Sequence, residues 1–300
     1  MGNERRTWFA FFTVIAAWGS SYLFIRLAVE SFTPTGLVFT RFGIASLLCA
    51  GIAIARGERF PRGPIALRFG AVGILMMTGS NALTAFAQHT VASGITGVVH
   101  SLGSVWLAAL GSLGAFGADV PRTPTRAWWG VVVGVFGVAM LLWPDATQAR
   151  SEAVGILALL LATTLFAGAS VLQRRTQALR AREGHTAGLF SQLAVQMGAA
   201  SAAAGLLSMH FGLLHAPLTA TSLSAITVLT LFASVAGFAA FATVLQNWPP
   251  ARAGSFGVVN PVVSVFLGVL VLQEPVTGRM VLGAAVTLAA VAWVQRVTAR

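Results

Sequence analysis

The sequence predicts an all-α integral membrane protein with ten transmembrane helices arranged as two inverted five-helix repeats. The 300 residues are 56% apolar and only 9% charged, whereas a soluble domain holds about a quarter charged residues. Ten apolar runs of about 20 residues are long enough to cross a bilayer. Two pairs of short motifs also recur between the halves of the chain. The lipid bilayer is therefore an expected partner of this protein.

Ten spans follow from scanning for long runs that are poor in charge. Ten of the eleven prolines fall at or between the ends of these runs, where a missing amide donor is tolerated best. Pro261 is the exception and predicts a kink in the ninth span. The runs cover residues 8–29, 35–55, 69–88, 92–117, 127–143, 153–172, 187–209, 223–245, 253–272 and 280–294.

The arginines predict the orientation of the spans. The net charge of +11 comes from nineteen arginines and no lysine, against eight acids. With a cytoplasmic N-terminus, 15 arginines fall in cytoplasmic loops and two in outer loops, while Arg26 and Arg41 lie within spans. Because basic loops favour the cytoplasmic side, both termini are predicted to face the cytoplasm, with the cell (inner) membrane as the expected location. A nucleic-acid partner is not expected, since no soluble element carries a basic face.

Two motif pairs divide the chain into halves, residues 1–148 and 149–300. One pair has an offset of 148 residues and the other an offset of 160, and the 12 extra residues are assigned to a loop at 173–185. Because each half has five spans, an odd number, the second half enters the membrane from the opposite side, as in many alternating-access carriers. The pairs are Trp18-Gly19-Ser20 with Phe166-Ala167-Gly168, followed by Arg26 and Arg174, and residues 94–100 (GITGVVH) with residues 254–260 (GSFGVVN).

Several of these motifs resemble the EamA-type branch of the drug/metabolite transporter superfamily. They are Trp18-Gly19-Ser20-Ser21, Arg41-Phe42, Ala253-Gly254, Asn260-Pro261-Val262, Gln273-Glu274-Pro275-Val276-Thr277 and Gly283. The resemblance implies a ten-helix fold whose central cavity is formed largely by the first, third and fourth helices of each half. It also implies transport of amino acids, metabolites or drugs, with export as the expected direction.

The first half departs from the family pattern at two points. Asp119-Val120-Pro121 stands where Glu274-Pro275 stands in the second half, and no proline corresponds to Pro261. The two gates of such a carrier therefore need not work identically.

Seven side chains within the spans are candidate substrate-binding residues. Aromatic walls with a few polar groups are typical of a pocket for a small solute, although each residue could instead serve helix packing. In the sharpest form of the hypothesis, Trp18 and Phe166 line the cavity from symmetric positions, while His100 and Asn260 supply polar contacts. The seven residues are Trp18, Arg41, Asn81, His100, Trp106, Phe166 and Asn260.

Two of these residues carry alternatives that the sequence leaves open. Arg41 would either bind a substrate carboxylate or serve a structural pairing or gate lock, because a charge within a span is costly and usually functional. His100 would either titrate during transport or stay neutral and bond to a neighbouring helix.

No pattern predicts a catalytic residue, a metal site or a cofactor. The sequence lacks His-Glu-x-x-His, paired acids, Gly-x-Ser-x-Gly and a phosphate-binding Gly-rich loop, and its histidines lack metal-ligand spacing. All eight acids are expected in loops or at span edges, which argues against a proton relay through a buried carboxylate. The expected function is an alternating-access carrier for a small organic molecule, with a passive channel or, more remotely, an intramembrane enzyme as alternatives. A monomer is expected, and a homodimer stays open.

Overall fold

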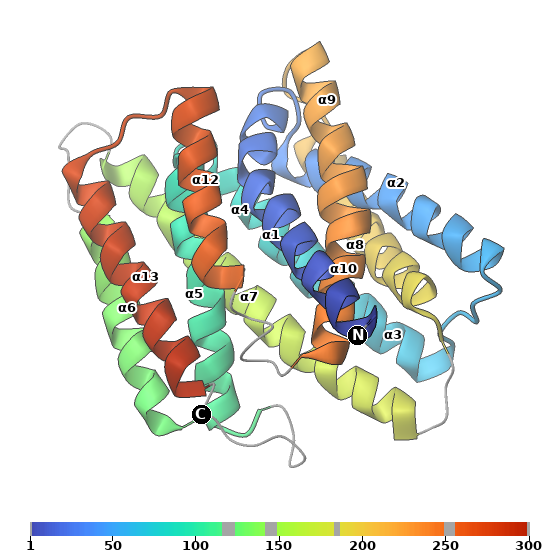
Figure 1. Cartoon of the computed structure of the whole chain (residues 1–300). Coiled ribbons are helices and arrows are strands. Elements are labelled where there is room, and N and C mark those ends of the chain that lie inside the picture. The colour runs from blue at the N-terminus through green and yellow to red at the C-terminus, as the bar shows by residue number, and fades with distance from the viewer. Residues whose placement is uncertain (1, 116–123, 142–148, 183–186, 249–255, 299–300) are drawn as a thin grey trace.

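The computed structural model describes residues 2–115, 124–141, 149–182, 187–248 and 256–298. In these residues every regular element is a helix, accompanied by two isolated β-bridges. The helices lie side by side in one bundle, and both termini lie at its lower end in Figure 1. The elements are α1 (Gly2–Ala28), α2 (Pro34–Ala55), α3 (Gly63–Gly73), η1 (Ile74–Gly79), α4 (Ser80–Ala87), α5 (Ser93–Ser112), η2 (Thr125–Ala127), α6 (Trp128–Leu141), α7 (Ala149–Arg182), α8 (Leu189–Phe211), α9 (Ala220–Val228), η3 (Leu229–Ala236), α10 (Gly237–Asn247), α12 (Phe256–Leu272) and α13 (Gly278–Thr298).

Seven of the described helical segments are long and apolar enough to cross a membrane. Two of them are composite: α3, η1 and α4 form one segment over Gly63–Ala87, and α9, η3 and α10 form another over Ala220–Val244. Trp128–Val138 and Val259–Leu272 are apolar but shorter. By length and composition, the structure therefore accounts for seven of the ten expected spans.

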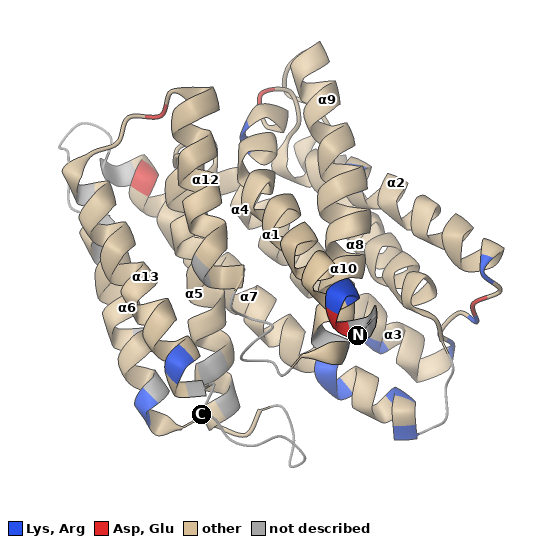
Figure 2. Cartoon of the chain, viewed as in Figure 1, with Lys and Arg blue, Asp and Glu red and all other residues tan. Residues whose placement is uncertain are grey.

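Charged side chains gather at the ends of the helices and leave the middle of the bundle largely uncharged (Figure 2). Large apolar side chains such as Leu47, Leu67 and Phe266 are exposed there instead. An exposed apolar belt of this kind is costly in water and is covered by lipid in a membrane. Most of the described arginines lie toward the end of the bundle that carries both termini (Figure 2).

One expected loop is a helix. Residues 173–185 were predicted to connect two spans, but α7 continues through Arg182, and residues 183–186 lie outside the described part of the chain. The stretch Gln173–Arg182 contains no glycine or proline, and its Gln, Arg, Ala and Leu residues are good helix formers. Arg180 and Arg182 in the last turn also interact favourably with the helix dipole. The arginines after residue 172 end the apolar run, but the helix continues through them.

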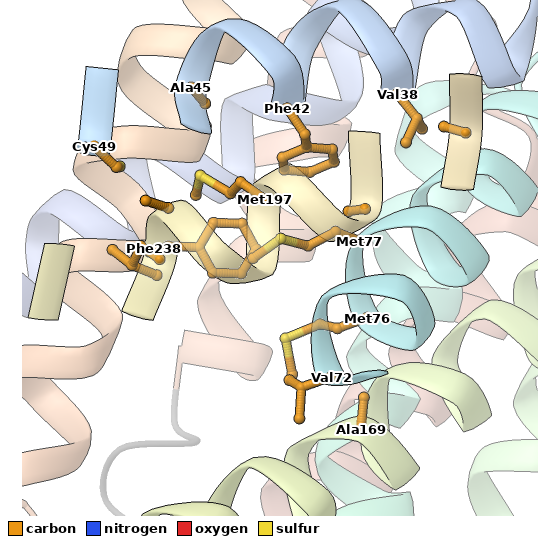
Figure 3. Close-up of a cluster of buried hydrophobic side chains, with 14 residues drawn as sticks. Val38, Phe42, Ala45, Cys49, Val72, Met76, Met77, Ala169, Met197 and Phe238 are labelled. Carbon is orange, nitrogen blue, oxygen red and sulfur yellow. The ribbon is translucent and has the colours of Figure 1, made fainter. Parts of the chain in front are cut away.

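The α2–α8 pair forms the core shown in Figure 3. Phe42 and Cys49 of α2 face Met197 of α8, while Met77 of η1 reaches the same cluster. Glycines let the two helices approach closely. A Cβ on Gly43 would lie 2.9 Å from the Ser201 Oγ, and a Cβ on Gly198 would lie 3.0 Å from the Ser46 Oγ.

Polar contacts tie α2 to α8 reciprocally along their length. The Ser46 hydroxyl donates to the Ala194 carbonyl at 2.8 Å, and the Ser201 hydroxyl donates to the Phe39 carbonyl at 2.9 Å. Ser46 and Ser201 are 155 positions apart, as are Phe39 and Ala194.

Bridges at the two ends of the α2–α8 pair also join residues at the offset of 155. Phe32 bridges to Leu214 at one end, and Arg59 bridges to Ala187 at the other. Phe32 and Ala187 are 155 positions apart, as are Arg59 and Leu214. The first bridge is antiparallel and the second is parallel, so both ends of the pair are joined, while the matching contacts are the hydrogen bonds in its middle.

Two π-helical segments interrupt helices at corresponding places. η1 begins at Ile74 and η3 begins at Leu229, again 155 positions apart. Their carbonyl groups accept hydrogen bonds from side chains: Asn81 donates to Met76 at 3.1 Å, and the Trp18 indole donates to Ala233 at 3.2 Å. Single π-helical turns occur frequently at functional sites.

Glutamates from distant loops cap two helices. Glu274 accepts from the backbone amides of Ser93 at 2.7 Å and Gly94 at 3.1 Å, at the N-terminus of α5. Glu58 accepts from the Ser191 amide at 2.9 Å in the first turn of α8. A carboxylate at this place satisfies free amides and complements the helix dipole.

We therefore expect Glu274→Ala to lower the melting temperature of the purified protein in detergent, because loss of a helix cap costs about 0.5–2 kcal/mol. The melting temperature of Glu274→Gln should lie between those of Glu274→Ala and the wild type, since the glutamine amide oxygen still accepts hydrogen bonds. Glu30→Ala, which removes an exposed acid, is the matched control. A Glu274→Ala protein that melts with the wild type would contradict the capping role.

Candidate functional site

A cavity of about 100 Å³ lies inside the bundle, between helices from both halves of the chain. For comparison, an engineered apolar cavity of about 150 Å³ holds benzene. Six of the seven candidate residues line the cavity: Trp18, Arg41, Asn81, His100, Phe166 and Asn260. The sequence thus predicted side chains that the fold brings together from six helices, α1, α2, α4, α5, α7 and α12.

Trp106 is the exception. Its ring packs against a separate apolar cluster formed with α7 and α13, and its indole nitrogen is buried without a partner in the described chain. The α5 residues that line the cavity are His100, Ser101, Gly103, Ser104 and Leu107. They follow the three-to-four-residue spacing of one helix face, which leaves Trp106 pointing elsewhere. The expectation that Trp106 lines this cavity is therefore not met.

Arg41 is the charged side chain in the wall of the cavity. Only 4% of it is exposed. Its Nε donates to the Ser234 hydroxyl at 2.7 Å, and its Nη1 makes a long contact of 3.4 Å to the Asn81 Oδ1. The guanidinium carbon also lies 4.8 Å from the centre of the Phe42 ring. Arg41 makes no ion pair within the described residues.

Both partners of Arg41 come from the π-helical regions. Ser234 belongs to η3, and Asn81 is the second residue after η1. The guanidinium therefore joins α2 to the interrupted helices of both halves.

Aromatic rings gather around Trp18 in the same site. Its ring centre lies 6.3 Å from that of Phe166 in an edge-on arrangement, 5.2 Å from Phe238 and 5.4 Å from Phe256. Edge-to-face pairs at these separations are favourable. Trp18 and Phe166, predicted at symmetric positions, are therefore in direct contact.

His100 bonds to a neighbouring helix. Its Nε2 lies 2.8 Å from the Thr84 Oγ1 on α4, and its ring centre lies 5.3 Å from that of Tyr22. The Thr84 hydroxyl also donates to the Ser80 carbonyl at 2.7 Å. His100 therefore makes the bond to a neighbouring helix that one of its two alternatives describes.

Asn260 lies on α12 directly before Pro261 and is 5% exposed. Its Oδ1 has no hydrogen-bond partner in the described chain. Buried amide oxygens normally have partners, so this group retains bonding capacity beside the cavity.

Some lining residues carry no sequence signal that singles them out. Phe238 follows η3, Phe256 begins α12, and Ser104 lies one turn beyond His100. A phenylalanine or serine in a span is equally consistent with helix packing and with a place in a cavity wall. Of the three, only Phe256 lies in a quoted motif, residues 254–260, so its offset partner in the first half could have drawn attention to it.

None of the described residues that line the cavity is a carboxylate. Glu4 and Glu152 lie in the first turns of α1 and α7, while Glu30, Glu58 and Glu274 lie between helices. The remaining acids, Asp119, Asp145 and Glu183, lie outside the described residues. No group of three potential metal ligands exists among the residues that the structure describes.

Two histidines meet beyond the helix ends, away from the cavity lining. The ring of His89, just after α4, lies 5.6 Å from the ring of His215 in the α8–α9 connection. Partial burial, then His215 and then Arg26 lower the pKa of His89 below its ordinary value of 6.5. Arg26 is fixed nearby, because its Nη1 donates to the Gln88 carbonyl.

A lowered pKa in the folded state makes stability fall with acidification. The unfolded chain binds the proton first, so the His89 contribution is present above pH 6.5 and is lost as pH falls toward the lowered value. We expect the melting temperature to drop between pH 7.5 and 5.5, and to drop less in His89→Gln. His210→Gln, which changes an exposed histidine at the end of α8, should behave like the wild type. An equal drop in His89→Gln and wild type would contradict this assignment.

The described residues form a helical bundle with an apolar outer surface and a cavity between its halves, whose mainly apolar lining carries a few polar groups. Residues 6–143 and 153–296 each match the EamA-like transporter family. The chain belongs to that family, as the resemblance of its motifs indicated, and it is an integral membrane protein.

Relatives and a solved structure agree with this assignment. The chain is 31% identical over 261 residues to YedA of Escherichia coli K12, described as an uncharacterized inner membrane transporter, covering 86% of this chain and 80% of the relative. It is 22% identical over 285 residues to an uncharacterized transporter of Archaeoglobus fulgidus, covering 94% and 96%. A crystal structure at 18% identity has a TM-score of 0.67 over 99% of this chain and 98% of that one, which supports the fold alone.

Proposed function

We propose that the protein is a ten-helix, inverted-repeat secondary carrier that moves a small organic solute by alternating access, with export as its physiological direction. The solute is an amino acid, a metabolite or a drug-like molecule of similar size. The observation that carries the proposal is the cavity where the two halves meet, together with the α2–α8 contacts that repeat at an offset of 155 residues.

The fixed offset supports the inverted repeat. A two-fold axis between halves turns every contact between residue i and residue j into a second contact between their counterparts. The Ser46–Ala194 and Ser201–Phe39 hydrogen bonds have this relation. The two bridges join residues at the same offset, although one is antiparallel and the other parallel, and the two π-helical segments begin at that offset. Trp18 and Phe166 correspond at the separate offset of 148 and meet each other, as counterparts near such an axis do.

The division at residues 148 and 149 agrees with the separate family matches to residues 6–143 and 153–296. The gathering of arginines toward the end with both termini favours a cytoplasmic location for both. The relative from Escherichia coli K12 is described as an inner membrane protein, which supports the inner membrane here.

The fold also suggests which parts move. We take the α2–α8 pair as the fixed element, because it is tied at both ends. The π-helical segments are the flexible points, since their hydrogen bonding is already irregular and their neighbours Asn81 and Phe238 touch the cavity. Pro261 removes one hydrogen bond within α12 beside Asn260.

Counterflow in proteoliposomes tests the carrier. We expect saturable uptake of a labelled solute that accelerates when the same unlabelled solute is inside, because a carrier returns faster when loaded. Trp18→Ala and Phe166→Ala should reduce this flux at least about tenfold, given the energy of a truncated aromatic contact. Trp106→Phe, which lies outside the cavity, should retain it.

Flux that is linear in solute and lacks acceleration would instead establish a passive channel. Full-rate flux in both alanine variants would contradict the role of Trp18 and Phe166.

A disulfide between positions 59 and 187, which form one of the two bridges, tests whether the α2–α8 pair stays together during transport. Backbones in paired strands lie about 4.7–4.9 Å apart, within the Cα range of about 4.4–6.8 Å that disulfides need. Arg59 and Ala187 are paired in this way, so Arg59→Cys with Ala187→Cys, in a Cys49→Ala background, should form the bond on oxidation. We expect counterflow to continue at the rate of the reduced sample. Oxidation that stops flux, with recovery on reduction, would show that α2 and α8 separate during the cycle.

A further inference from the structure

The guanidinium of Arg41 is incompletely satisfied. An arginine side chain has five N–H bonds, and the described residues accept two of them, through Ser234 and Asn81. One N–H on Nη1 and both on Nη2 have no acceptor there. The side chain is 4% exposed and lines the cavity, so an acceptor for these donors has to enter through the cavity.

The repeat does not need a charge at this position. The residue 155 positions beyond Arg41 is Gln196 on α8, which is 2% exposed. It is neutral, and its Nε2 donates to the Gln173 Oε1 at 2.9 Å. The same place in the α2–α8 packing is therefore filled by an uncharged amide whose donor is satisfied within the protein. A structural requirement for Arg41 would apply equally to its counterpart.

The charge balance of the cavity is one-sided. No described lining residue is a carboxylate, so Arg41 supplies the permanent charge among them. In a site that excludes water, an unpaired cation attracts an anion strongly and rejects a second cation. A carboxylate also matches the planar fork of arginine, because it accepts two parallel N–H bonds.

On the proposed carrier function we infer that the transported solute is a small organic carboxylate, bound through Arg41 with its apolar body against Trp18 and Phe166. Ser234 and Asn81 hold the guanidinium in place before the solute arrives, so little ordering is needed on binding. A neutral amide of the same shape leaves the guanidinium without a counter-charge and binds more weakly.

Matched acids and amides test this class directly. Calorimetric titration of the wild-type protein in detergent at pH 7 would compare acetate, propionate, benzoate and phenylacetate with their primary amides, and benzoate with benzylamine. We expect at least one acid to bind and its amide to bind at least about tenfold more weakly, because charge-assisted bonds are roughly twice as strong as neutral ones.

Two substitutions of Arg41 test whether this residue causes the preference for acid over amide. Arg41→Gln copies the natural residue at the repeat-related position and should keep the fold while losing the preference for acid over amide. Arg41→Lys should retain part of it. Gln196→Asn is the control and should bind as the wild type does.

Equal binding of acid and amide, tighter binding of benzylamine, or binding of none of the acids would overturn the inference. An unchanged preference in a folded Arg41→Gln protein would also overturn it. Counterflow of a neutral or cationic solute would overturn the carboxylate class and leave the carrier standing, so the two proposals fail separately.

Discussion

The hydrogen bond from Arg41 to Ser234 is the interaction on which the organisation of the site depends. It joins α2 of the first half to η3 of the second, within a cavity whose other walls are aromatic and amide side chains. Burying a guanidinium without an ion pair opposes folding, and the surrounding packing has to offset that cost. The interrupted backbones of η1 and η3 lie next to it, where Asn81 and Trp18 bond to their carbonyls. The irregular parts of the structure therefore lie at one place, around the charge.

The regular part is the α2–α8 pair. Its small residues permit close approach, its serines bond across the interface, and bridges join both ends. These contacts come in pairs with the same offset, whereas Arg41 and Gln196 break the relation. We interpret the symmetric contacts as the framework of the protein and the asymmetric residue as the source of its selectivity.

Much of the fold could be predicted from the sequence because the bilayer allows few backbone structures. Apolar length predicted ten spans, and seven described segments are long and apolar enough to cross a membrane. The motif pairs gave residues that do meet, such as Trp18 and Phe166. The end of α7 was predicted wrongly, because arginines end an apolar run without ending a helix. Trp106 was misplaced because an aromatic residue in a span gives no sign of which helix face it occupies.

Other features depend on packing between distant segments. Ser234 lies 193 residues from Arg41, and no local pattern marks it as the partner. A π-helical turn differs from an α-helix by a shift in hydrogen bonding, which residues 74–79 and 229–236 do not reveal in their composition. The offset of 155 is also hidden, because the motif pairs at 148 and 160 lie in other helices. The matching contacts at this offset become visible only when the packed helices are compared.

The central claim is that the solute binds between the two halves at Arg41. A crystal structure with a bromine-substituted carboxylate that the protein transports would test it most directly, because anomalous scattering locates the bromine independently of the protein. The account predicts a bromine peak between Trp18 and Phe166, with the carboxylate accepting from the terminal nitrogens of Arg41. A peak outside the cavity, with Arg41 still bound only to Ser234 and Asn81, would contradict it.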